Sequence, residues 1–466
     1  MAQYSAYPSY VTTGCDWFPR IPEHWILDRA KWAVMSCQNG VWGSEPDGDD
    51  DLVCIRVADF DRQSLTISTT NLTMRSIAYK DRNTRLLKNG DLLIEKSGGG
   101  DQQLVGAVVE YNQDFPAVSS NFVARMEVND NTDSRFLVYL HAHLYSGRVN
   151  YRSIKQTTGI QNLDSSAYLN ERIAYPPLDE QKAIARFLDH KTAQIDALIA
   201  KKQSLLDKLA EQRTALISQA VTKGLDPSVP LKDSGVDWLG EIPAHWMMTK
   251  LRFVINDIEQ GWSPQCHNQS ADEDQWGVLK VGCVNGEEFN PNENKALPED
   301  LEPRQRYEIK PGDILVSRAN TKELLGSAAL VKTIQKKLLL CDKLYRIKPS
   351  EKVDSSYLLR FLRSSIARYQ YEKDATGTSG SMQNIGQDTI KNLSLPLPPL
   401  PEQISIAKTL QHEYTKGLVV ETKIKSVIHR LQEYRSTLIT NAVTGKIDVR
   451  GYCIPTTTEQ REVAHG

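Results

Sequence analysis

The longest periodic pattern of apolar positions in this chain lies between Pro176 and Asp226. From Ile184 onward the seam positions advance in steps of four and three residues: Leu188, Lys191, Ile195, Leu198, Lys202, Leu205, Leu209, Gln212 and Leu216. Heptad spacing with few polar interruptions predicts a long helix that packs against another helix. At 1.5 Å per residue, the roughly 41 residues from Glu180 to Ala220 would form a rod of about 60 Å.

The same stretch occurs a second time at Pro398 to Asp448, without a gap and at an offset of 222 residues. Two polar seam positions of the first copy, Lys202 and Gln212, become Ile424 and Tyr434 in the second. Because the two seams are filled in a complementary way, we expect the two helices to pack on each other. The alternative is an ordinary dimerisation coiled coil, which is the commoner use of such a pattern.

A shorter motif, here called the entry motif, also occurs twice, as GCDWFPRIPEHW at Gly14–Trp25 and GVDWLGEIPAHW at Gly235–Trp246. Each copy precedes a region of short apolar or β-branched runs separated by turn residues, which is typical of a mainly β domain. A helix is expected near Ser134–Ser146 and another in the equivalent SSYLLRFLRSSIARYQYE stretch. His24 and His245 stand beside tryptophan in both copies, so we expect packing roles for them.

These repeats predict an α+β fold in which two mainly β domains are joined by two long antiparallel helices, with a pseudo-twofold internal repeat. The expected boundaries are residues 1–176 for the first domain, 177–225 for the first helix, 226–397 for the second domain, 398–446 for the second helix and 447–466 for a tail.

The composition is that of an ordinary folded protein, with 24% charged and 40% hydrophobic residues among 466. No apolar run approaches the roughly 18 residues that span a bilayer, so we expect a cytoplasmic protein without membrane contact. The seven cysteines are scattered and never spaced as CxxC, which disfavours a disulfide framework or a metal site. A net charge of −2 means that any nucleic-acid contact must rest on local patches.

Two such patches occupy equivalent places, and each combines basic and tyrosine side chains with a following loop that contains Gln-Asn. Cations can hold phosphates, and amide side chains can make bidentate contacts with adenine edges. The candidate DNA contacts of the first half are Trp42, Lys96, Ser97, Gly98, Arg148, Arg152, Lys155, Thr157, Gln161 and Asn162. Those of the second half are Trp262, Arg318, Asn320, Arg360, Arg363, Arg368, Thr378, Gln383 and Asn384. The alternative is a solvated helix face beside a structural loop.

Sequence patterns of catalysis are missing. The chain has no GxxxxGK[ST], no strand-linked GxGxxG, no HExxH and no NPPY-like tetrapeptide. The HAH sequence at His141–His143 has no matching cluster of metal-ligating residues. We therefore expect no catalytic residues, no metal and no cofactor in this chain.

Two variable domains, each followed by a helix that starts with PxxEQ and ends with QAVTKGLD or NAVTGKID, resemble the specificity subunit of a Type I restriction and modification system. The segment KDSGVDWLGEIPAHW at Lys232–Trp246 is similar to the family's inter-domain signature, from which the N-terminal copy TTGCDWFPR departs. The resemblance covers essentially the whole chain.

The resemblance implies a non-catalytic subunit that binds double-stranded DNA, with one domain for each half of a split target and the helices fixing the spacer. It also implies two modification subunits, which methylate adenine with S-adenosylmethionine, and two restriction subunits, which use ATP and Mg. We expect the helix starts to contact the modification subunits, through Leu178, Glu180, Leu400 and Glu402. The alternatives are a stand-alone coiled-coil DNA-binding scaffold without enzyme partners, a fused restriction enzyme, and an adaptor that does not bind DNA.

Overall fold

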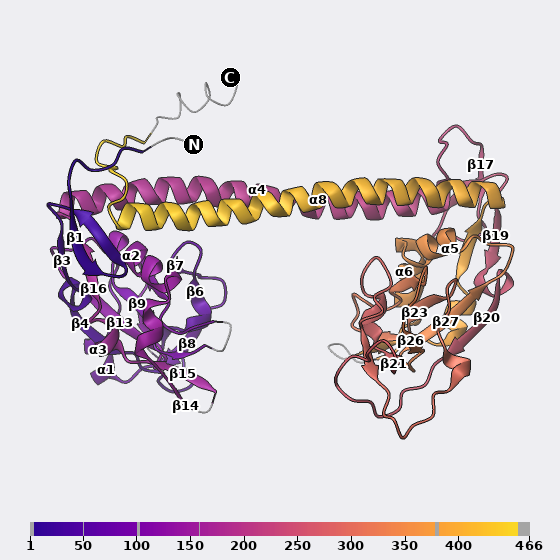
Figure 1. Ribbon diagram of the computed structural model, residues 1–466, viewed down its shortest axis with the longest axis horizontal. Helices are drawn as coiled ribbons and strands as arrows, with labels where there is room; N and C mark the ends of the chain where they lie inside the picture. The colour runs from indigo at the N-terminus through magenta and orange to yellow at the C-terminus, as the bar shows by residue number, and fades with distance from the viewer. Residues whose placement is uncertain (1–3, 50, 100–102, 158, 378–381, 455–466) are drawn as a thin grey trace. The chain divides into compact units, whose positions relative to one another are not determined.

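The computed structural model describes residues 4–49, 51–99, 103–157, 159–377 and 382–454. It divides into two compact units, one made of Met1–Lys202 with Ser426–Gly466 and the other of Gln203–Lys425. Each unit contains one globular domain and a part of each of two long helices, α4 (Leu178–Lys223) and α8 (Leu400–Val443) (Figure 1). The globular parts are called domain 1 and domain 2 below.

Domain 1 is built on a four-stranded antiparallel sheet with the order β11-β9-β13-β4. Its strands are β11 (Val108–Glu110), β9 (Leu92–Glu95), β13 (Val123–Val128) and β4 (Val34–Asn39). A second sheet has the order β12-β5-β8, in which β5 pairs parallel with β12 and antiparallel with β8. These strands are β12 (Ala117–Ser119), β5 (Asp51–Ile55) and β8 (Thr73–Ser76).

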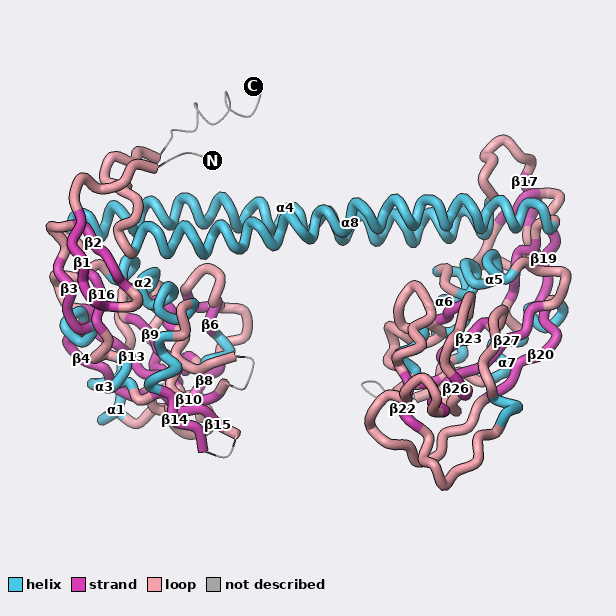
Figure 2. The backbone as a smooth tube through the Cα atoms, viewed as in Figure 1, coloured by secondary structure: helices cyan, strands magenta, loops and turns pink. Residues whose placement is uncertain are grey.

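Domain 2 repeats both sheets. Its four-stranded sheet has the order β25-β23-β27-β20, formed by Ala328–Leu330, Ile314–Ser317, Leu344–Pro349 and Ile255–Gln260. Its three-stranded sheet joins β22 (Asn294–Ala296), β21 (Trp276–Leu279) and β26 (Lys337–Leu339), again with one parallel pair. The α+β fold with two mainly β domains and an internal repeat is therefore confirmed (Figure 2).

Shorter elements complete each unit. In the first they are β1 (Tyr10–Cys15), β2 (Phe18–Pro22), β3 (Ile26–Arg29), β6 (Phe60–Asp61), β7 (Thr66–Ile67), α1 (Tyr79–Arg85), β10 (Ser97–Gly98), α2 (Ser134–Ser146), β14 (Ile154–Thr157), β15 (Ile160–Leu163), α3 (Ser165–Tyr168) and β16 (Arg172–Tyr175). In the second they are β17 (Leu231–Asp233), β18 (Glu241–Pro243), β19 (Met247–Lys250), β24 (Ala319–Asn320), α5 (Ser355–Leu362), α6 (Ser365–Asp374), β28 (Gln383–Asn384), α7 (Gln387–Lys391) and β29 (Ser394–Leu397).

The helix α2 spans the residues that the sequence predicts, whereas its counterpart in domain 2 is broken into α5 and α6. The break follows from Ser364, whose hydroxyl caps the N-terminus of α6 by accepting a hydrogen bond from the amide of Ala367 at 3.3 Å. Serine is a favoured N-cap residue, so one helix can end before Ser364 and the next can begin after it.

The repeated GDLLIE and GDILVS sequences carry a buried ion pair in each domain. Arg125 Nε lies 2.6 Å from Asp91 Oδ2, and Arg346 Nη1 lies 3.4 Å from Asp313 Oδ2. Each aspartate also accepts a hydrogen bond from the amide of the lysine three residues before it. The aspartate therefore fixes the turn before the central strand and satisfies an arginine on the neighbouring strand.

Each unit has its own apolar core, to which both helices contribute. In the first unit Ile184 and Leu188 of α4 are buried with Leu438 and Val443 of α8. In the second unit Ile217 and Val221 are buried with Ile406 and Leu410. Since the start of one helix lies beside the end of the other, α4 and α8 run antiparallel within each unit, as predicted.

Away from the domains the seam is only half covered. Leu198 is 47% exposed and Leu205 is 41% exposed, and on α8 Val420 and Val427 are 43% and 41% exposed. One partner helix covers only part of such a stripe, so these apolar side chains remain accessible. In the parts of the chain that the structure describes, no helix is long and apolar enough to cross a membrane.

Candidate nucleic-acid interface

The structure brings together two predicted segments that are far apart in the sequence. In domain 1, β10 follows the central strand β9 and pairs with β15, so that Ser97 lies opposite Asn162 and Gly98 opposite Gln161. In domain 2, β24 follows β23 and pairs with β28, which sets Ala319 opposite Asn384 and Asn320 opposite Gln383. The two ladders match residue for residue at the offset of 222. In domain 1 this edge lies on the side of the domain that is away from the long helices α4 and α8 (Figure 2).

Within the first ladder, the two amide side chains differ in what they contact. The Gln161 side chain is buried, and its Oε1 accepts a hydrogen bond from the amide of Val105 at 3.2 Å. The neighbouring Asn162 is exposed, and its Oδ1 accepts from Ser97 Oγ at 2.5 Å. Gly98 has a φ of +131°, which favours glycine at this position. Gln161 thus holds the loop, and Asn162 faces solvent.

Basic side chains surround this edge. Lys96 Nζ donates to Asn39 Oδ1 at 2.8 Å, and the exposed Lys155 lies 2.9 Å from Asp164 Oδ2. The hydrogen bond from Lys155 lowers the pKa of the Asp164 carboxyl group. The predicted side chain of Thr157 lies outside what the structure describes.

Two further arginines of domain 1 lie in the segment that follows α2. Arg148 is exposed and has a left-handed backbone with a φ of +57°. Arg152 lies over the ring of Trp17 at 4.8 Å and 3.6 Å from Asp16, so it contacts the entry motif. A guanidinium above an indole ring gains cation–π attraction.

A cavity of about 520 Å³ opens beside the first ladder. It is lined by the predicted residues Trp42, Ser97 and Gly98, and by Phe122 and Ile160, which sequence reasoning missed. An exposed phenylalanine in a loop carries no sequence signal that separates it from a core residue. Arg75 lies 4.1 Å above the ring of Trp42 and fixes that side chain from one face.

The second ladder carries different chemistry. Asn320 is buried, and its Nδ2 donates to Asn285 Oδ1 at 3.0 Å. Arg318 Nη1 donates to the carbonyl of Asp342 at 3.3 Å, while Gln383 and Asn384 are half-buried. Trp262 packs beneath Arg304, whose guanidinium lies 4.3 Å from the ring. Thr378 is not among the residues that the structure describes.

The predicted arginines of α5 and α6 have protein partners. Arg360 is buried and its Nη2 donates to Gln411 Oε1 of α8 at 2.8 Å. Arg363 Nη1 lies 2.5 Å from Glu287 Oε2, and Arg368 Nη1 donates to the carbonyl of Leu325 at 2.8 Å. Burial, together with the neighbouring positive charges, lowers the pKa of Arg363 to about 10. The structure thus places Arg360 and Arg363 where domain 2 meets the helices.

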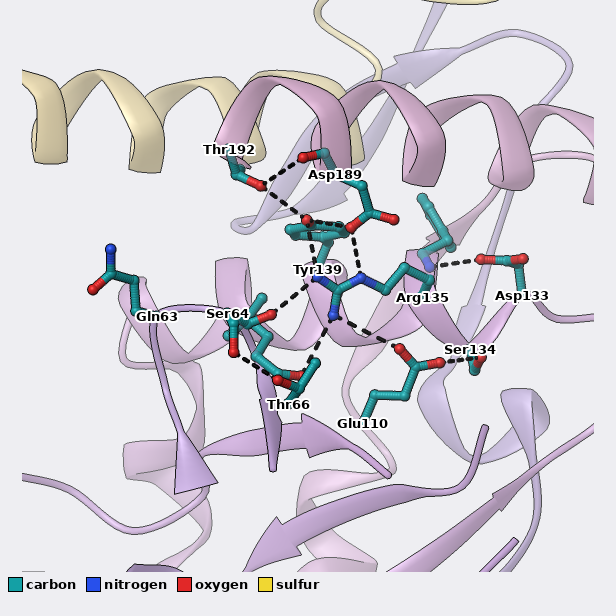
Figure 3. A network of polar contacts seen from close by, with 12 residues as sticks. Gln63, Ser64, Thr66, Glu110, Asp133, Ser134, Arg135, Tyr139, Asp189 and Thr192 are labelled. Atoms are coloured by element: carbon teal, nitrogen blue, oxygen red, sulfur yellow. Dashed lines mark hydrogen bonds and ion pairs between the residues drawn. The ribbon is translucent and has the colours of Figure 1, made fainter. Parts of the chain in front are cut away.

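The corresponding junction of the first unit is shown in Figure 3. Arg135 Nε lies 2.6 Å from Asp189 Oδ1 of α4, and the Tyr139 hydroxyl donates to the same oxygen at 2.7 Å. Arg135 Nη1 also lies 3.7 Å from Glu110 Oε2. One face of α2 is therefore tied to α4 through Arg135 and Tyr139.

At the helix starts, the glutamates predicted to bind partner subunits contact the entry motifs. Glu180 is only 5% exposed and accepts hydrogen bonds from the Tyr7 hydroxyl, from Trp25 Nε1 at 3.0 Å and from His24. Glu402 lies 2.7 Å from His245 Nε2. Leu178 is half-buried, whereas Leu400 is 42% exposed. Of these four side chains, Leu400 is the most accessible.

No group of three or more His, Cys, Asp or Glu side chains suited to a metal ion occurs among the described residues. In the HAH sequence, His141 Nδ1 lies 2.8 Å from the Tyr168 hydroxyl and His143 Nδ1 lies 3.2 Å from Thr440 Oγ1. Burial lowers the pKa of His141 to about 4. The two histidines thus contact different protein groups.

Comparison with known proteins gives consistent matches. The family model described as the Type I restriction modification DNA specificity domain matches residues 63–207 and 268–430. The EcoKI specificity subunit of Escherichia coli is 24% identical over 443 residues, which is 92% of this chain and 90% of that protein. The EcoEI specificity subunit of Escherichia coli is 31% identical over 209 residues, which is 44% of this chain but only 35% of that relative's length.

A solved structure from work on the assembly and conformational transition of the Type I R-M system has the same fold. It has a TM-score of 0.62 and 17% sequence identity, and the match covers 92% of this chain and 99% of the solved chain.

Proposed function

The chain belongs to the Type I restriction modification DNA specificity family, and we infer that it is the subunit that recognises the DNA target of a Type I restriction-modification complex. Nothing in the comparisons favours a stand-alone scaffold. We further propose that the target is split, with one domain for each half-site and the two helices setting the spacer between them.

One observation carries the split-target proposal. The two domains share sheet order and a matched loop ladder, yet equivalent positions differ: Gly98 corresponds to Asn320, and Ser97 to Ala319. A common scaffold with divergent loops is expected when two domains do the same task on different ligands. Two different half-sites in one DNA target would require this combination.

We assign roles to the predicted residues from their contacts. Asn162 in domain 1, with Gln383 and Asn384 in domain 2, would contact base edges, because amide groups can pair with adenine. Trp42 would pack its ring against the DNA beside them. The exposed cations Arg148 and Lys155 would contact phosphates and add affinity without sequence preference. The buried Gln161 and Asn320 would support the loops. Arg360 and Arg363 would hold domain 2 on the helices.

We propose that catalysis lies in partner subunits. Two modification subunits would methylate adenine with S-adenosylmethionine, and two restriction subunits would use ATP and Mg, all in the cytoplasm. The exposed apolar side chains Leu198, Leu205, Leu418 and Val427 on the helices offer docking area beyond Leu178 and Leu400. Apolar stripes of this kind are typical of protein contact surfaces.

Adenine methylation across the genome tests the proposal. Cells that carry this chain with its cognate modification subunit should show a split methylated motif that is missing when this chain is deleted. The motif would give both half-sites and the spacer length together. A soluble complex that yields no new methylated motif would contradict the recognition role.

A further inference from the structure

The cavity beside the first ladder has a mostly apolar lining, which is formed by loops that connect different strands. Three large side chains in it are partly exposed: Trp42 by 37%, Phe122 by 49% and Ile160 by 54%. Exposed apolar groups gathered at one place are costly in water, and such patches usually mark a binding site. The cavity adjoins Ser97 and Gly98, so it belongs to the proposed recognition edge.

Charge in this cavity is already neutralised by protein groups. Its arginine, Arg56, pairs with Asp59 at 2.8 Å, and its buried carboxylate, Glu95, pairs with Arg62 at 2.8 Å. A phosphate would find no free cation among these lining groups, so an uncharged ligand fits better.

A buried polar group in the lining lacks a partner. Ser120 is 1% exposed, and its hydroxyl has no hydrogen-bond partner among the residues that the structure describes. Leaving a buried hydroxyl unpaired is unfavourable, which suggests that a ligand supplies the missing contact. A ligand with an apolar group and a nearby polar edge would match the whole lining.

Domain 2 carries different residues at the matched positions. The amide of Lys96 donates to the carbonyl of Phe122 at 2.8 Å, and the amide of Arg318 donates to that of Lys343 at 3.0 Å. These equivalent hydrogen bonds make Phe122 and Lys343 counterparts. At this position domain 1 therefore has an exposed apolar ring where domain 2 has an exposed cation.

We propose that this cavity receives the 5-methyl group and adjoining polar edge of a thymine in the half-site of domain 1. Thymine presents its methyl group and the O4 acceptor side by side in the major groove, and proteins distinguish it there by apolar contact. Phe122 and Ile160 would contact the methyl group, and the Ser120 hydroxyl would be the hydrogen-bond donor. The proposal rests on the proposed DNA-recognition function and adds the chemical identity of one contacted base.

The test starts from the methylated motif of the wild-type complex, which establishes the target. Duplexes are then made in which each thymine of the target is replaced singly by deoxyuridine, which lacks only the methyl group. Binding of the assembled complex is measured for the wild type and for Phe122→Ala. We expect one thymine whose replacement weakens wild-type binding about fivefold, with little further loss in the Phe122→Ala complex.

Matched variants assign the domain. Phe122→Lys should alter recognition in one half-site only, and Lys343→Ala should alter only the other. Phe122→Leu keeps an apolar contact and should retain the preference for thymine, which separates recognition from misfolding. Assembly with the modification subunit serves as the folding control for each variant.

Failure of the two proposals would look different. If the wild-type complex yields no motif, the recognition function itself fails. If it yields a motif, but deoxyuridine has the same effect in the wild type and in Phe122→Ala at every position, the thymine assignment is wrong.

Discussion

His24 Nε2 lies 2.8 Å from Glu180 Oε2, and the equivalent pair His245–Glu402 is separated by 2.7 Å. Each pair joins an entry motif to the first turn of the helix that follows the same domain. The glutamine next to each glutamate, Gln181 or Gln403, accepts a hydrogen bond from the amide of the residue that caps α2 or α5. The repeated PxxEQ sequence is therefore a structural joint between a domain and its helix.

The same entry motif also contacts the end of the other helix. Gly445, after α8, has a φ of +69° and packs on Trp25, while Gly224, after α4, has a φ of +76° and packs on Trp246. A Cβ at Gly445 would lie 2.4 Å from Pro22 Cδ. Gly445 therefore has no room for a side chain, and at both positions the left-handed backbone favours glycine, which explains why glycine follows both helices.

The first prediction concerns the buried member of these pairs. Glu180→Ala should lower the free energy of unfolding of the first unit by about 3 kcal/mol, because it leaves the buried Tyr7 hydroxyl and Trp25 indole without their acceptor. The matched control Glu402→Ala removes a 30% exposed carboxylate and should cost about 1 kcal/mol or less. Urea denaturation of both variants measures the difference. Equal losses would show that burial does not distinguish the two joints.

The second prediction concerns acid sensitivity. His141 has a pKa lowered from 6.5 to about 4 by burial, so between these values the unfolded chain binds more protons than the folded one. The contribution of neutral His141 to the free energy of unfolding should be fully present above pH 6.5. Below pH 6.5 it should decrease, by at most about 1.4 kcal/mol per pH unit. His141→Phe should flatten this dependence between pH 5 and 6.5, even though it also removes the contact with Tyr168.

Denaturant titrations at several pH values measure the slope. The control is His412→Phe, which makes the same replacement at an exposed position of α8. A slope that persists in His141→Phe would assign the acid sensitivity to other groups.

Much of this fold could be predicted because the chain repeats itself. The offset of 222 residues identifies the two helices and the two domains, and it also aligns Gln161-Asn162 with Gln383-Asn384 in matched ladders. What a single sequence could not show is which polar side chain faces inward. Gln161 is buried because it bonds Val105, a contact between residues far apart in the sequence.

The basic patches show the same limit. In the sequence, Arg360 and Arg363 form the same pattern of basic residues as an exposed phosphate-binding helix face would. In the structure, the loop that carries Glu287 and the helix α8 cover them. The cavity at Phe122 was missed for the opposite reason, since an apolar residue in a β run is usually part of the core. In both cases, contacts between residues far apart in the sequence determine whether the side chain is buried or exposed.

The third prediction concerns the arginine cluster in unit 2. Arg213, Arg360 and Arg363 all pair with Glu287. Glu287→Gln would leave three neighbouring cations without their counter-ion, and should lower the free energy of unfolding by about 3 kcal/mol or more. In unit 1, Asp196 Oδ1 pairs with one arginine, Arg435, whose Nε lies 3.0 Å away. Asp196→Asn should therefore lower the free energy of unfolding by less. Calorimetry of the two variants compares them, and a smaller loss for Glu287→Gln would contradict the charge argument.

The fourth prediction separates the two amides of the first ladder. Asn162→Ala should relax the methylated motif at one half-site and leave stability within about 0.5 kcal/mol, because the side chain is exposed. Gln161→Ala should instead lower stability by about 1–2 kcal/mol, since it removes the acceptor of a buried amide. Motif sequencing and denaturation are both measured on each variant. Identical behaviour of the two would refute the division between base contact and loop support.

The last prediction tests whether the helices set the spacer. An insertion near Val221 would disturb a buried contact, because that side chain is fully enclosed in the core of its unit. Seven residues inserted after Lys202 and seven after Lys425 would instead lengthen both helices outside the cores and preserve the heptad register. At 1.5 Å per residue the pair adds about 10 Å, which is about three base pairs of B-DNA. Both half-sites should stay the same while the spacer grows by that amount.

Insertion into α4 alone provides the control, because the unmatched helix cannot keep its seam against α8 and methylation should be lost. An unchanged spacer in the doubly extended chain would mean that the partner subunits, and not these helices, determine the distance between the half-sites. An altered half-site would mean that the helices also influence how the domains recognise bases. Only a longer spacer with both half-sites intact agrees with domains that each recognise their half-site independently of helix length.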